Sequence, residues 1–444
     1  MRLTEAAELA DQAADASLCM MSTVRGHRRT RGWAAIFIGL VVVACAGETS
    51  DSAATDAPTT VAESSTQTVS PQPSGTVTSS SPSPSGRSSP VWQRVAEFGE
   101  PAGFTMATEL VRGETGYLAI GQRTEGAAGG APGFGPVATY LWASADGEAW
   151  EELPTPPGLE GALPTALITT PEREFVIYSS TPTGPEATWE LLSLRSNDGR
   201  TWEPFESGLA PGTSVVQVVH GSGGYLLMEQ TPGQDAGLWL SQDGLTWEQV
   251  HRFEQTERFM QVSDIGAGEE GFVAIGQRIE LDTTWQRFTV ASADGREWVE
   301  SLEPFGPQNP DYRPDGFVSS LGPDWIAVLP NRDESVQFWV SANGLAWEPA
   351  GTIPDVGTSF GWIPELVEAD GRLFFSPYVF APDGPPGVWT STDGHAWAEI
   401  ETDFMPVLGD VIAGPDRLIL VGGMRLENRD MRAAFWYRSL EDAP

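Results

Sequence analysis

The sequence contains no lysine, few basic residues of any kind and only two cysteines. All 25 basic side chains are arginine, against 61 Asp and Glu residues, and the formal net charge is −36 at pH 7. Nucleic-acid binding depends on clustered cations that neutralise phosphates. This charge balance therefore excludes an ordinary DNA- or RNA-binding protein, and it also disfavours direct contact with anionic lipid headgroups.

Both cysteines, Cys19 and Cys45, lie within the first 45 residues. The remainder of the chain can therefore form no disulfide and no thiolate metal site. No spacing typical of a metal site occurs among the four histidines, which are His27, His220, His251 and His395. We expect no metal and no cofactor, and a fold stabilised by an apolar core to which 17 Trp and 19 Phe contribute.

Long apolar segments are also lacking near the start of the chain. The run from Trp33 to Ala44 has 12 residues, too few to span a bilayer as a helix but typical of the core of a signal peptide. The run ends in Val42-Val43-Ala44-Cys45, which resembles the lipobox of bacterial lipoproteins. In that family the cysteine is lipidated and becomes the first residue of the mature protein.

Residues 1–45 are therefore predicted to be a signal peptide with lipidation at Cys45. An ordinary signal peptide and a signal anchor are the alternatives. Because the segment before Arg25 is acidic, Met20 or Met21 is the more natural start of translation. We expect the mature protein at the outer face of the bacterial cytoplasmic membrane, which it would contact through the lipid anchor alone.

Residues 46–89 are almost entirely Ser, Thr, Pro, Ala and Gly with a few acidic residues. Such a segment cannot bury enough apolar surface to offset the entropy of the chain, so it is predicted to be disordered. It would form a tether between the anchor and the folded part of the protein, residues 90–440.

A motif of the form Ser-x-(Asp/Asn)-Gly-x-x-Trp occurs six times in the folded part. The copies are SADGEAW (Ser144–Trp150), SNDGRTW (Ser196–Trp202), SQDGLTW (Ser241–Trp247), SADGREW (Ser292–Trp298), SANGLAW (Ser341–Trp347) and STDGHAW (Ser391–Trp397). Their final tryptophans are 52, 45, 51, 49 and 50 residues apart. Spacing this regular indicates a repeated structural unit.

Each motif lies between two short apolar runs, which predicts a strand, a tight turn and a second strand. Asp-Gly or Asn-Gly provides the positive φ angles of a hairpin turn, and the Ser and Asp side chains can bond its backbone groups. We refer to these six segments as the Ser-Asp-Gly turns. A second recurring unit, exemplified by Glu109–Arg123 and Asp264–Arg278, adds two strands upstream of each turn. Four strands in about fifty residues are typical of one blade of a β-propeller.

The two ends of the folded part resemble two halves of one repeat. Residues 90–98 match the segment that follows a Ser-Asp-Gly turn, and residues 433–439 match the segment that precedes one. The first strand is therefore predicted to complete the blade that the last three strands begin, which hides the sheet edges. The expected fold is all-β, a monomeric seven-bladed β-propeller of four-stranded antiparallel blades closed by the N- and C-terminal strands of one blade. A six-bladed ring is the alternative.

The Ser-Asp-Gly turn resembles the Asp-box, or BNR repeat, of sialidases, xyloglucan-cleaving glycosidases and sortilin-type receptors. Seven-bladed photosystem II assembly factors are also similar. The resemblance covers residues 90–439 and implies a sialidase-like propeller of the WD40-YVTN-BNR-like superfamily. It is uninformative about activity, because in those families the motif lies at the blade periphery, away from the ligand face. We expect its Asp residues to stabilise turns rather than to bind metal.

No complete catalytic signature is present. A sialidase site would need an arginine cluster, a Tyr-Glu pair and a Phe/Tyr-Arg-Ile-Pro segment, and the closest tetrapeptide, Tyr312-Arg313-Pro314-Asp315, lacks the Ile-Pro ending. Gly-x-Ser-x-Gly, phosphate-loop and dinucleotide-binding fingerprints are also missing. Cleavage of sialosides is therefore not expected, and no catalytic residue is assigned.

Candidate ligand-binding residues occupy one aligned position on the innermost strand of each repeat. They are Glu109, Gln217, Asp264, Glu365 and Asp410, with Ala166 and Ser320 in the other two repeats. Carboxylates near one level of a central channel would repel each other and could bind a cation. Two carboxylates at a suitable separation could also hydrolyse a glycoside. The alternative is that this position caps backbone groups of a neighbouring strand.

Several loops predicted on the face opposite the Ser-Asp-Gly turns contain aromatic residues, namely Phe134, Trp189, Trp285, Tyr312, Phe360 and Trp362. Exposed aromatic and acidic residues suit a protein or carbohydrate ligand, although each aromatic could instead pack within a blade. The leading interpretation is a non-enzymatic, surface-tethered binding or scaffold module for an unidentified protein or carbohydrate. The alternative is a carbohydrate-active hydrolase that uses the channel carboxylates.

Overall fold

The computed structural model describes residues 92–99, 103–125, 137–162, 164–182, 189–210, 212–230, 235–253, 260–279, 285–302, 304–306, 316–331, 335–354, 363–378, 387–400, 406–426 and 431–440. The predicted signal peptide, Cys45 and the tether lie outside these ranges. No helix within them is long and apolar enough to cross a membrane. The regular secondary structure of the described residues is entirely β-strand.

Five sheets have four antiparallel strands each, arranged in chain order. The first contains β6 (Pro164–Thr169), β7 (Phe175–Pro182), β8 (Trp189–Ser196) and β9 (Glu203–Pro204). The second contains β10 (Val215–Gly221), β11 (Gly224–Gln230), β12 (Ala236–Ser241) and β13 (Glu248–Phe253). The third contains β14 (Met260–Gly268), β15 (Gly271–Ile279), β16 (Trp285–Ser292) and β17 (Val299–Leu302). The fourth contains β18 (Phe317–Leu321), β19 (Asp324–Pro330), β20 (Val336–Ser341) and β21 (Glu348–Ile353). The fifth contains β22 (Ile363–Ala369), β23 (Arg372–Tyr378), β24 (Trp389–Ser391) and β25 (Ala398–Glu399).

The remaining eight strands form one sheet that consists of two sets of four. One set contains β2 (Gly103–Arg112), β3 (Tyr117–Glu125), β4 (Val137–Ser144) and β5 (Glu151–Leu153). The other contains β26 (Pro406–Ala413), β27 (Arg417–Arg425), β28 (Met431–Ser439) and β1 (Gln93–Phe98). The only pairing between the described residues of the two sets is a parallel one, with Phe104 opposite Met431. Each set therefore corresponds in size to one of the other sheets.

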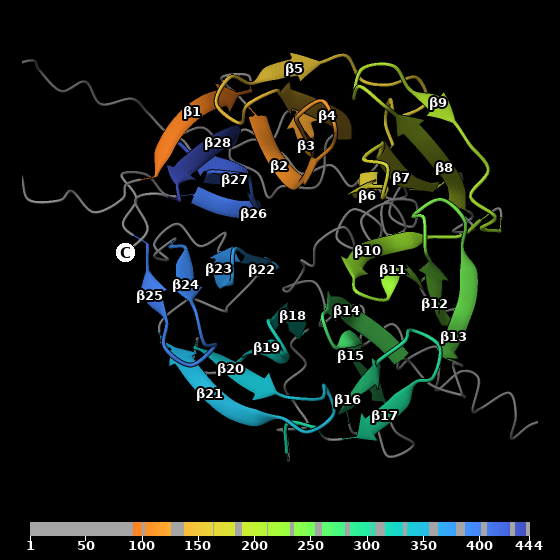
Figure 1. Ribbon diagram of the computed structural model, residues 1–444, viewed down its shortest axis with the longest axis vertical. Helices are drawn as coiled ribbons and strands as arrows, with labels where there is room; N and C mark the ends of the chain where they lie inside the picture. The colour runs from red at the N-terminus through yellow and green to blue at the C-terminus, as the bar shows by residue number, and fades with distance from the viewer. Residues whose placement is uncertain are drawn as a thin grey trace, which may run out of the picture.

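The sheets are arranged around a central axis, with the first strand of each set innermost and the short last strand on the outer rim (Figure 1). Buried apolar side chains fill the space between neighbouring sheets. Leu118 and Ile120 of β3, for example, pack with Phe175 and Ile177 of β7 in one such cluster. The all-β fold and the propeller architecture predicted from the repeats are therefore confirmed.

In all six Ser-Asp-Gly turns the Asp or Asn side chain accepts the same pair of backbone hydrogen bonds. In the first, Asp146 Oδ1 accepts hydrogen bonds from the backbone N–H groups of Glu148 (2.8 Å) and Ala149 (2.9 Å). Ser144 Oγ accepts from the N–H of Gly147, whose φ is +81°. The other Asp or Asn residues accept the same two N–H bonds. These side chains stabilise turns, as predicted.

Five of the six turns carry an ionisable Asp, and the pKa of each is lowered. Burial by itself would raise the pKa of Asp243. The N–H groups of Thr246 and Leu245 and the hydroxyls of Ser241 and Thr246 together outweigh burial and lower that pKa to about 2. The remaining turn, Ser341–Trp347, has Asn343, which does not titrate.

The free energy of unfolding should therefore fall as the pH drops from about 4 towards 2, because these carboxylates bind protons more weakly in the folded state than in the unfolded state. Above pH 5 their contribution should be fully present. Urea unfolding between pH 2 and 7 measures this. Asp243→Asn, which keeps the accepting oxygen as Asn343 does, should fold normally at pH 7 and show a shallower loss in acid. An unchanged pH slope in Asp243→Asn would contradict the assignment.

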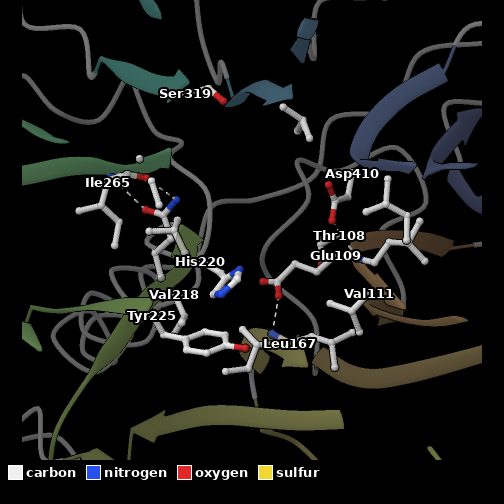
Figure 2. A pocket seen from close by; sticks show the side chains of 18 of the residues that line it. Thr108, Glu109, Val111, Leu167, Val218, His220, Tyr225, Ile265, Ser319 and Asp410 are labelled. Atoms are coloured by element: carbon white, nitrogen blue, oxygen red, sulfur yellow. Dashed lines mark hydrogen bonds between the residues drawn. The ribbon is translucent and has the colours of Figure 1, made fainter. Parts of the chain in front are cut away.

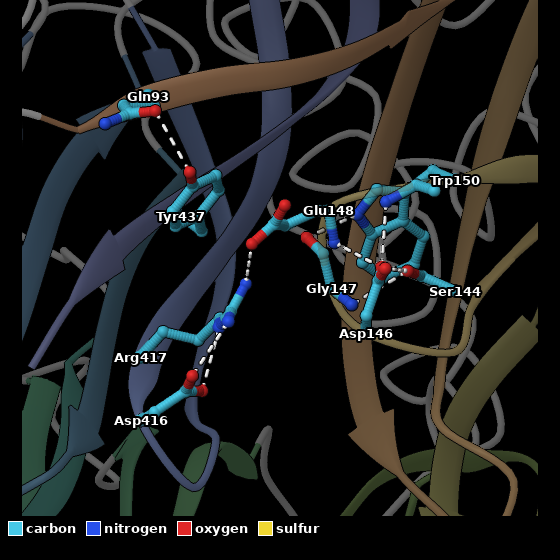
Figure 3. A network of polar contacts seen from close by, with 10 residues as sticks. Gln93, Ser144, Asp146, Gly147, Glu148, Trp150, Asp416, Arg417 and Tyr437 are labelled. Carbon is cyan, nitrogen blue, oxygen red and sulfur yellow. Dashed lines mark hydrogen bonds and ion pairs between the residues drawn. The ribbon is translucent and has the colours of Figure 1, made fainter.

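The N-terminal strand β1 pairs with β28, the last strand, in antiparallel register from Gln93 opposite Tyr437 to Phe98 opposite Ala433. The Tyr437 hydroxyl donates to Gln93 Oε1 at 3.0 Å (Figure 3). Phe98 lies edge-on to Phe435, with ring centroids 5.7 Å apart. The two ends of the folded part, about 340 residues apart in sequence, thus share a sheet, as the matching half-repeats indicated.

Candidate functional site

A central cavity of about 900 Å³ lies between the innermost strands β2, β6, β10, β14, β18, β22 and β26. Its wall includes three of the predicted carboxylates, Glu109, Asp264 and Asp410, as well as Gln217. Figure 2 shows Glu109, Asp410 and His220 around it. The structure therefore brings together residues that are separated by up to 301 positions in the sequence.

The strand pairing defines the aligned position. Glu109 lies opposite Ile120, and Asp264 lies opposite Ile275, each three residues after the large aromatic residue near the start of the second strand. The corresponding pair in β18 and β19 is Phe317 opposite Val328, so the prediction that Ser320 occupies this position is wrong. Ser320 lies three residues further along, and its hydroxyl donates to Ala267 O at 2.9 Å. Glu365 occupies the position in β22 by its pairing with Ser376.

The carboxylates at this position accept hydrogen bonds from the next innermost strand. Asp264 Oδ2 accepts from the N–H of Val318 at 2.8 Å. Glu109 Oε2 accepts from the N–H of Leu167. The same kind of hydrogen bond also joins the innermost strands from the two ends of the chain, β26 and β2.

Asp410 Oδ2 in β26 accepts from the N–H of Leu110 in β2 at 2.9 Å. In each case the N–H group belongs to the residue that directly follows the aligned position in the neighbouring strand: Leu110, Leu167 or Val318. Each of these side chains therefore tethers one innermost strand to its neighbour.

Gln217 makes the same connection without a charge. Its Oε1 accepts from the N–H of Ile265 at 3.2 Å, and its Nε2 donates to the carbonyl of Ile265 at 3.3 Å. Ala166 and Phe317, in β6 and β18, have no oxygen that could accept. Where this position carries a polar side chain, an uncharged amide makes the same connection as a carboxylate.

A β-bulge sets the direction of these side chains in β2, β14 and β26. The register shifts between Ala107 and Glu109 in β2, and equivalent shifts precede Asp264 and Asp410. Glycine lies in the second strand beside each bulge, at Gly121, Gly276 and Gly422. A Cβ at Gly121 would lie 2.0 Å from Met106 O, so the backbone of this bulge leaves no room for a side chain there.

One end of the cavity is bounded by the hairpins that join the first and second strands, and we call it the hairpin end. Arg112, Arg173 and His220 line the cavity there. The His220 ring packs on Tyr225, with centroids 4.4 Å apart, and this partial burial lowers the pKa of His220. Burial, together with the charges of Glu172 and Asp243, raises the pKa of Tyr225 to about 12. None of these residues was selected from the sequence.

The aromatic residues predicted to face a ligand have mixed outcomes. Trp189 is 5 % exposed at the start of β8, so it is a packing residue rather than part of an open surface. Trp285 is the first residue of β16. The remaining four fall outside the described residues: Phe134, Tyr312, Phe360 and Trp362.

No group of three or more His, Cys, Asp or Glu residues in the described part of the chain could hold a metal ion. The channel carboxylates instead direct oxygens at backbone N–H groups. Ligand binding by Glu109, Gln217, Asp264, Glu365 and Asp410 stays a prediction.

No protein-family model and no curated protein matches the chain. Among solved structures, it is similar to a protein of unknown function from Dyadobacter fermentans, with 15 % identity, a TM-score of 0.45, and coverage of 79 % of this chain and 99 % of that one. It is also similar to a Trypanosoma rangeli sialidase, with 12 % identity, a TM-score of 0.39, and coverage of 80 % and 58 %. An α-L-arabinofuranosidase of Fusarium graminearum gives 14 % identity, a TM-score of 0.37, and coverage of 62 % and 92 %. Similarity at this level says nothing about the chemistry of the site.

Proposed function

We propose that this protein is a non-enzymatic binding or scaffold module, held at the outer face of the bacterial cytoplasmic membrane by a lipid on Cys45 and a tether of residues 46–89. Its binding site would be the central cavity and its mouths. The ligand would be an unidentified protein or carbohydrate. Support comes from the cavity itself, whose volume of about 900 Å³ lies within the range typical of small-ligand sites.

One observation supports the non-enzymatic role most directly. Gln217 and the carboxylates make the same kind of hydrogen bond to the backbone of the next innermost strand. Retaining and inverting glycosidases need one carboxyl group that gives up a proton and a second that attacks or activates water. An amide can do neither, yet Gln217 occupies the same position and bonds the backbone of the next strand in the same way. Hydrogen bonding between innermost strands therefore accounts for the recurring acidic residues without catalysis.

We further propose that the sheets form a closed ring of seven blades. Two observations support closure beyond the strand pairing of β1 with β28. The β26–β28 and β2–β5 sets enclose a buried cluster that includes Ala107, Trp142 and Phe435. Arg417, in β27, contacts Glu148 in the turn between β4 and β5 (Figure 3).

A pair of substitutions at Glu109 tests the role of the aligned position. Glu109→Gln should change the free energy of unfolding by less than about 0.5 kcal/mol, because the amide oxygen can accept from Leu167 as Gln217 accepts from Ile265. Glu109→Ala should cost about 1–3 kcal/mol, because it leaves a buried N–H without an acceptor. Urea unfolding at pH 7 measures both, and equal losses would show that the charge itself matters.

The same variants separate binding from hydrolysis. The wild-type protein should release no chromophore from a panel of nitrophenyl glycosides and no reducing ends from polysaccharides. Robust turnover that is abolished by Glu109→Gln or Asp264→Asn would overturn the proposal in favour of a carbohydrate-active hydrolase. Asp243→Asn, in a Ser-Asp-Gly turn away from the cavity, is the matched control.

Anchoring is tested by Cys45→Ala in the producing cell. The substitution should move the protein from the membrane fraction to the medium or leave it as an unprocessed precursor, since two acyl chains hold a protein stably and none remains. Cys19→Ala should change nothing. Normal processing and full membrane retention of Cys45→Ala would contradict lipidation.

A further inference from the structure

Three basic side chains line the hairpin end of the cavity, and they come from three consecutive sheets. Arg112 is the last residue of β2, Arg173 lies in the turn between β6 and β7, and His220 is near the end of β10. All three line the cavity and are exposed. Four carboxylates, those of Glu109, Asp264, Glu368 and Asp410, line the same cavity, so the two arginines form a local positive patch in an otherwise acidic wall.

No acidic partner of either arginine lies in the described part of the chain. Among the described residues, neither Arg112 nor Arg173 forms an ion pair or donates a side-chain hydrogen bond, and Arg112 only approaches the ring of Tyr117, at 5.8 Å from its centroid. By contrast, Arg200 and Arg296 on the outer part of the fold are both paired with glutamates. The acidic neighbours of Arg173 in sequence do not line the cavity.

Arg173 is also held in a backbone conformation that disfavours it. Its φ is +66°, in the left-handed region. The equivalent residue of the turn between β22 and β23 is Gly371, which has the same φ of +66°. A non-glycine residue costs about 1–2 kcal/mol there, so the turn would be more stable with glycine. A cationic side chain is therefore present at this point of the cavity at the expense of stability.

Hydrogen bonds fix the three hairpins relative to each other. The N–H of Glu114 donates to Arg173 O at 3.4 Å, which joins the first hairpin to the second. The Tyr225 hydroxyl donates to Thr169 O at 2.6 Å, which joins the third to the second. The backbones that carry the two guanidinium groups and the His220–Tyr225 pair are thus positioned before any ligand arrives, which lowers the entropic cost of binding.

We infer that the hairpin end of the cavity binds the carboxylate of a small ligand between Arg112 and Arg173, with the body of the ligand against His220 and Tyr225. Guanidinium groups bind carboxylates through paired hydrogen bonds. The net charge of −36 would repel a polyanion, so a single negative charge fits best.

Carboxylates further along the cavity favour hydroxyl groups on the remainder of the ligand. Glu109 and Asp410 supply acceptor oxygens there. A sugar acid of the size of a uronic acid combines the two requirements, one carboxylate and several hydroxyls. This inference rests on the proposed binding role, because it states which ligand class that role concerns.

The experiment measures binding of D-glucuronate to the full-length protein by isothermal titration calorimetry, with D-glucose and inorganic phosphate as comparison probes. Glucuronate should bind at least about tenfold more tightly than either, and the affinity should fall as salt is added. Arg112→Gln and Arg173→Gly should each weaken binding about tenfold or more. Arg200→Gln, which removes an exposed paired arginine, should leave it unchanged.

Arg173→Gly keeps the test independent of folding, since this variant should melt at or above the wild-type temperature. Equal binding of glucuronate and glucose, or of glucuronate and phosphate, would overturn the inference, as would no measurable glucuronate binding. Binding of neutral sugars without a preference for the carboxylate would leave the proposed binding role standing while removing this one. Turnover of glycosides would instead remove the proposed role itself.

Discussion

Deletion of Trp92–Phe98 should abolish cooperative unfolding of the protein or cause it to aggregate. The deletion removes β1 and exposes the edge of β28. It also removes Trp92, which is 4 % exposed and lies edge-on to Phe374, and Phe98, which packs on Phe435. Loss of one such buried aromatic side chain costs about 3–5 kcal/mol, against a typical total stability of about 5–15 kcal/mol.

Thermal unfolding followed by near-ultraviolet circular dichroism, together with size-exclusion chromatography, measures this effect. Deletion of seven residues from the tether, 80–86, is the matched control and should leave melting unchanged. Trp436→Ala should reproduce part of the defect from the other end of the chain, because Trp436 is fully buried in the same sheet and packs in one cluster with Trp92. A soluble monomer with wild-type melting after the β1 deletion would contradict closure by the chain ends.

Gly422→Ala should lower the free energy of unfolding by more than about 2 kcal/mol. A Cβ at Gly422 would lie 1.9 Å from Val407 O, and this backbone oxygen cannot move without disturbing β26. Gly422 pairs with Leu408 beside the bulge that precedes Asp410, so the bond from Leu110 to Asp410 should weaken as well.

Chemical unfolding of Gly422→Ala and Gly208→Ala separates the causes. Gly208 has φ +76° and no atom within 4 Å of a Cβ placed there, so its substitution adds only backbone strain, about 1 kcal/mol. If Gly422→Ala loses no more stability than Gly208→Ala, close approach of the backbone is not the reason for glycine at this bulge.

The error at Ser320 shows where sequence alignment failed. Phe317 precedes Trp325 by 8 residues, just as Asp264 precedes Phe272 and Gln217 precedes Tyr225. The same interval to the large apolar residue near the start of the second strand therefore identifies the position in this repeat. Ser320 was predicted because it is polar, like Glu109 and Asp264. Phe317, which holds the position, has an apolar side chain.

The structure shows that the recurring acidic residues form hydrogen bonds between neighbouring innermost strands. Their recurrence was visible in the sequence, and so was the glycine that follows Ile120, Ile275 and Val421. That the carboxylate oxygens would meet N–H groups of the next sheet depends on how the sheets pack side by side. Residues as distant as Asp410 and Leu110, 300 positions apart, make this contact.

The sequence by itself determined the features that depend on neighbouring residues. The strand alternation, the six Ser-Asp-Gly turns and the matching half-repeats at the ends follow from local hydrogen bonding, backbone preferences and regular spacing. Only the tertiary structure decided what faces the central cavity. Arg112, Arg173 and His220 lie in unrelated local contexts, and nothing in their neighbours marks them. They come together because the packing of successive sheets places their hairpins around one axis, and that arrangement is a long-range property of the fold.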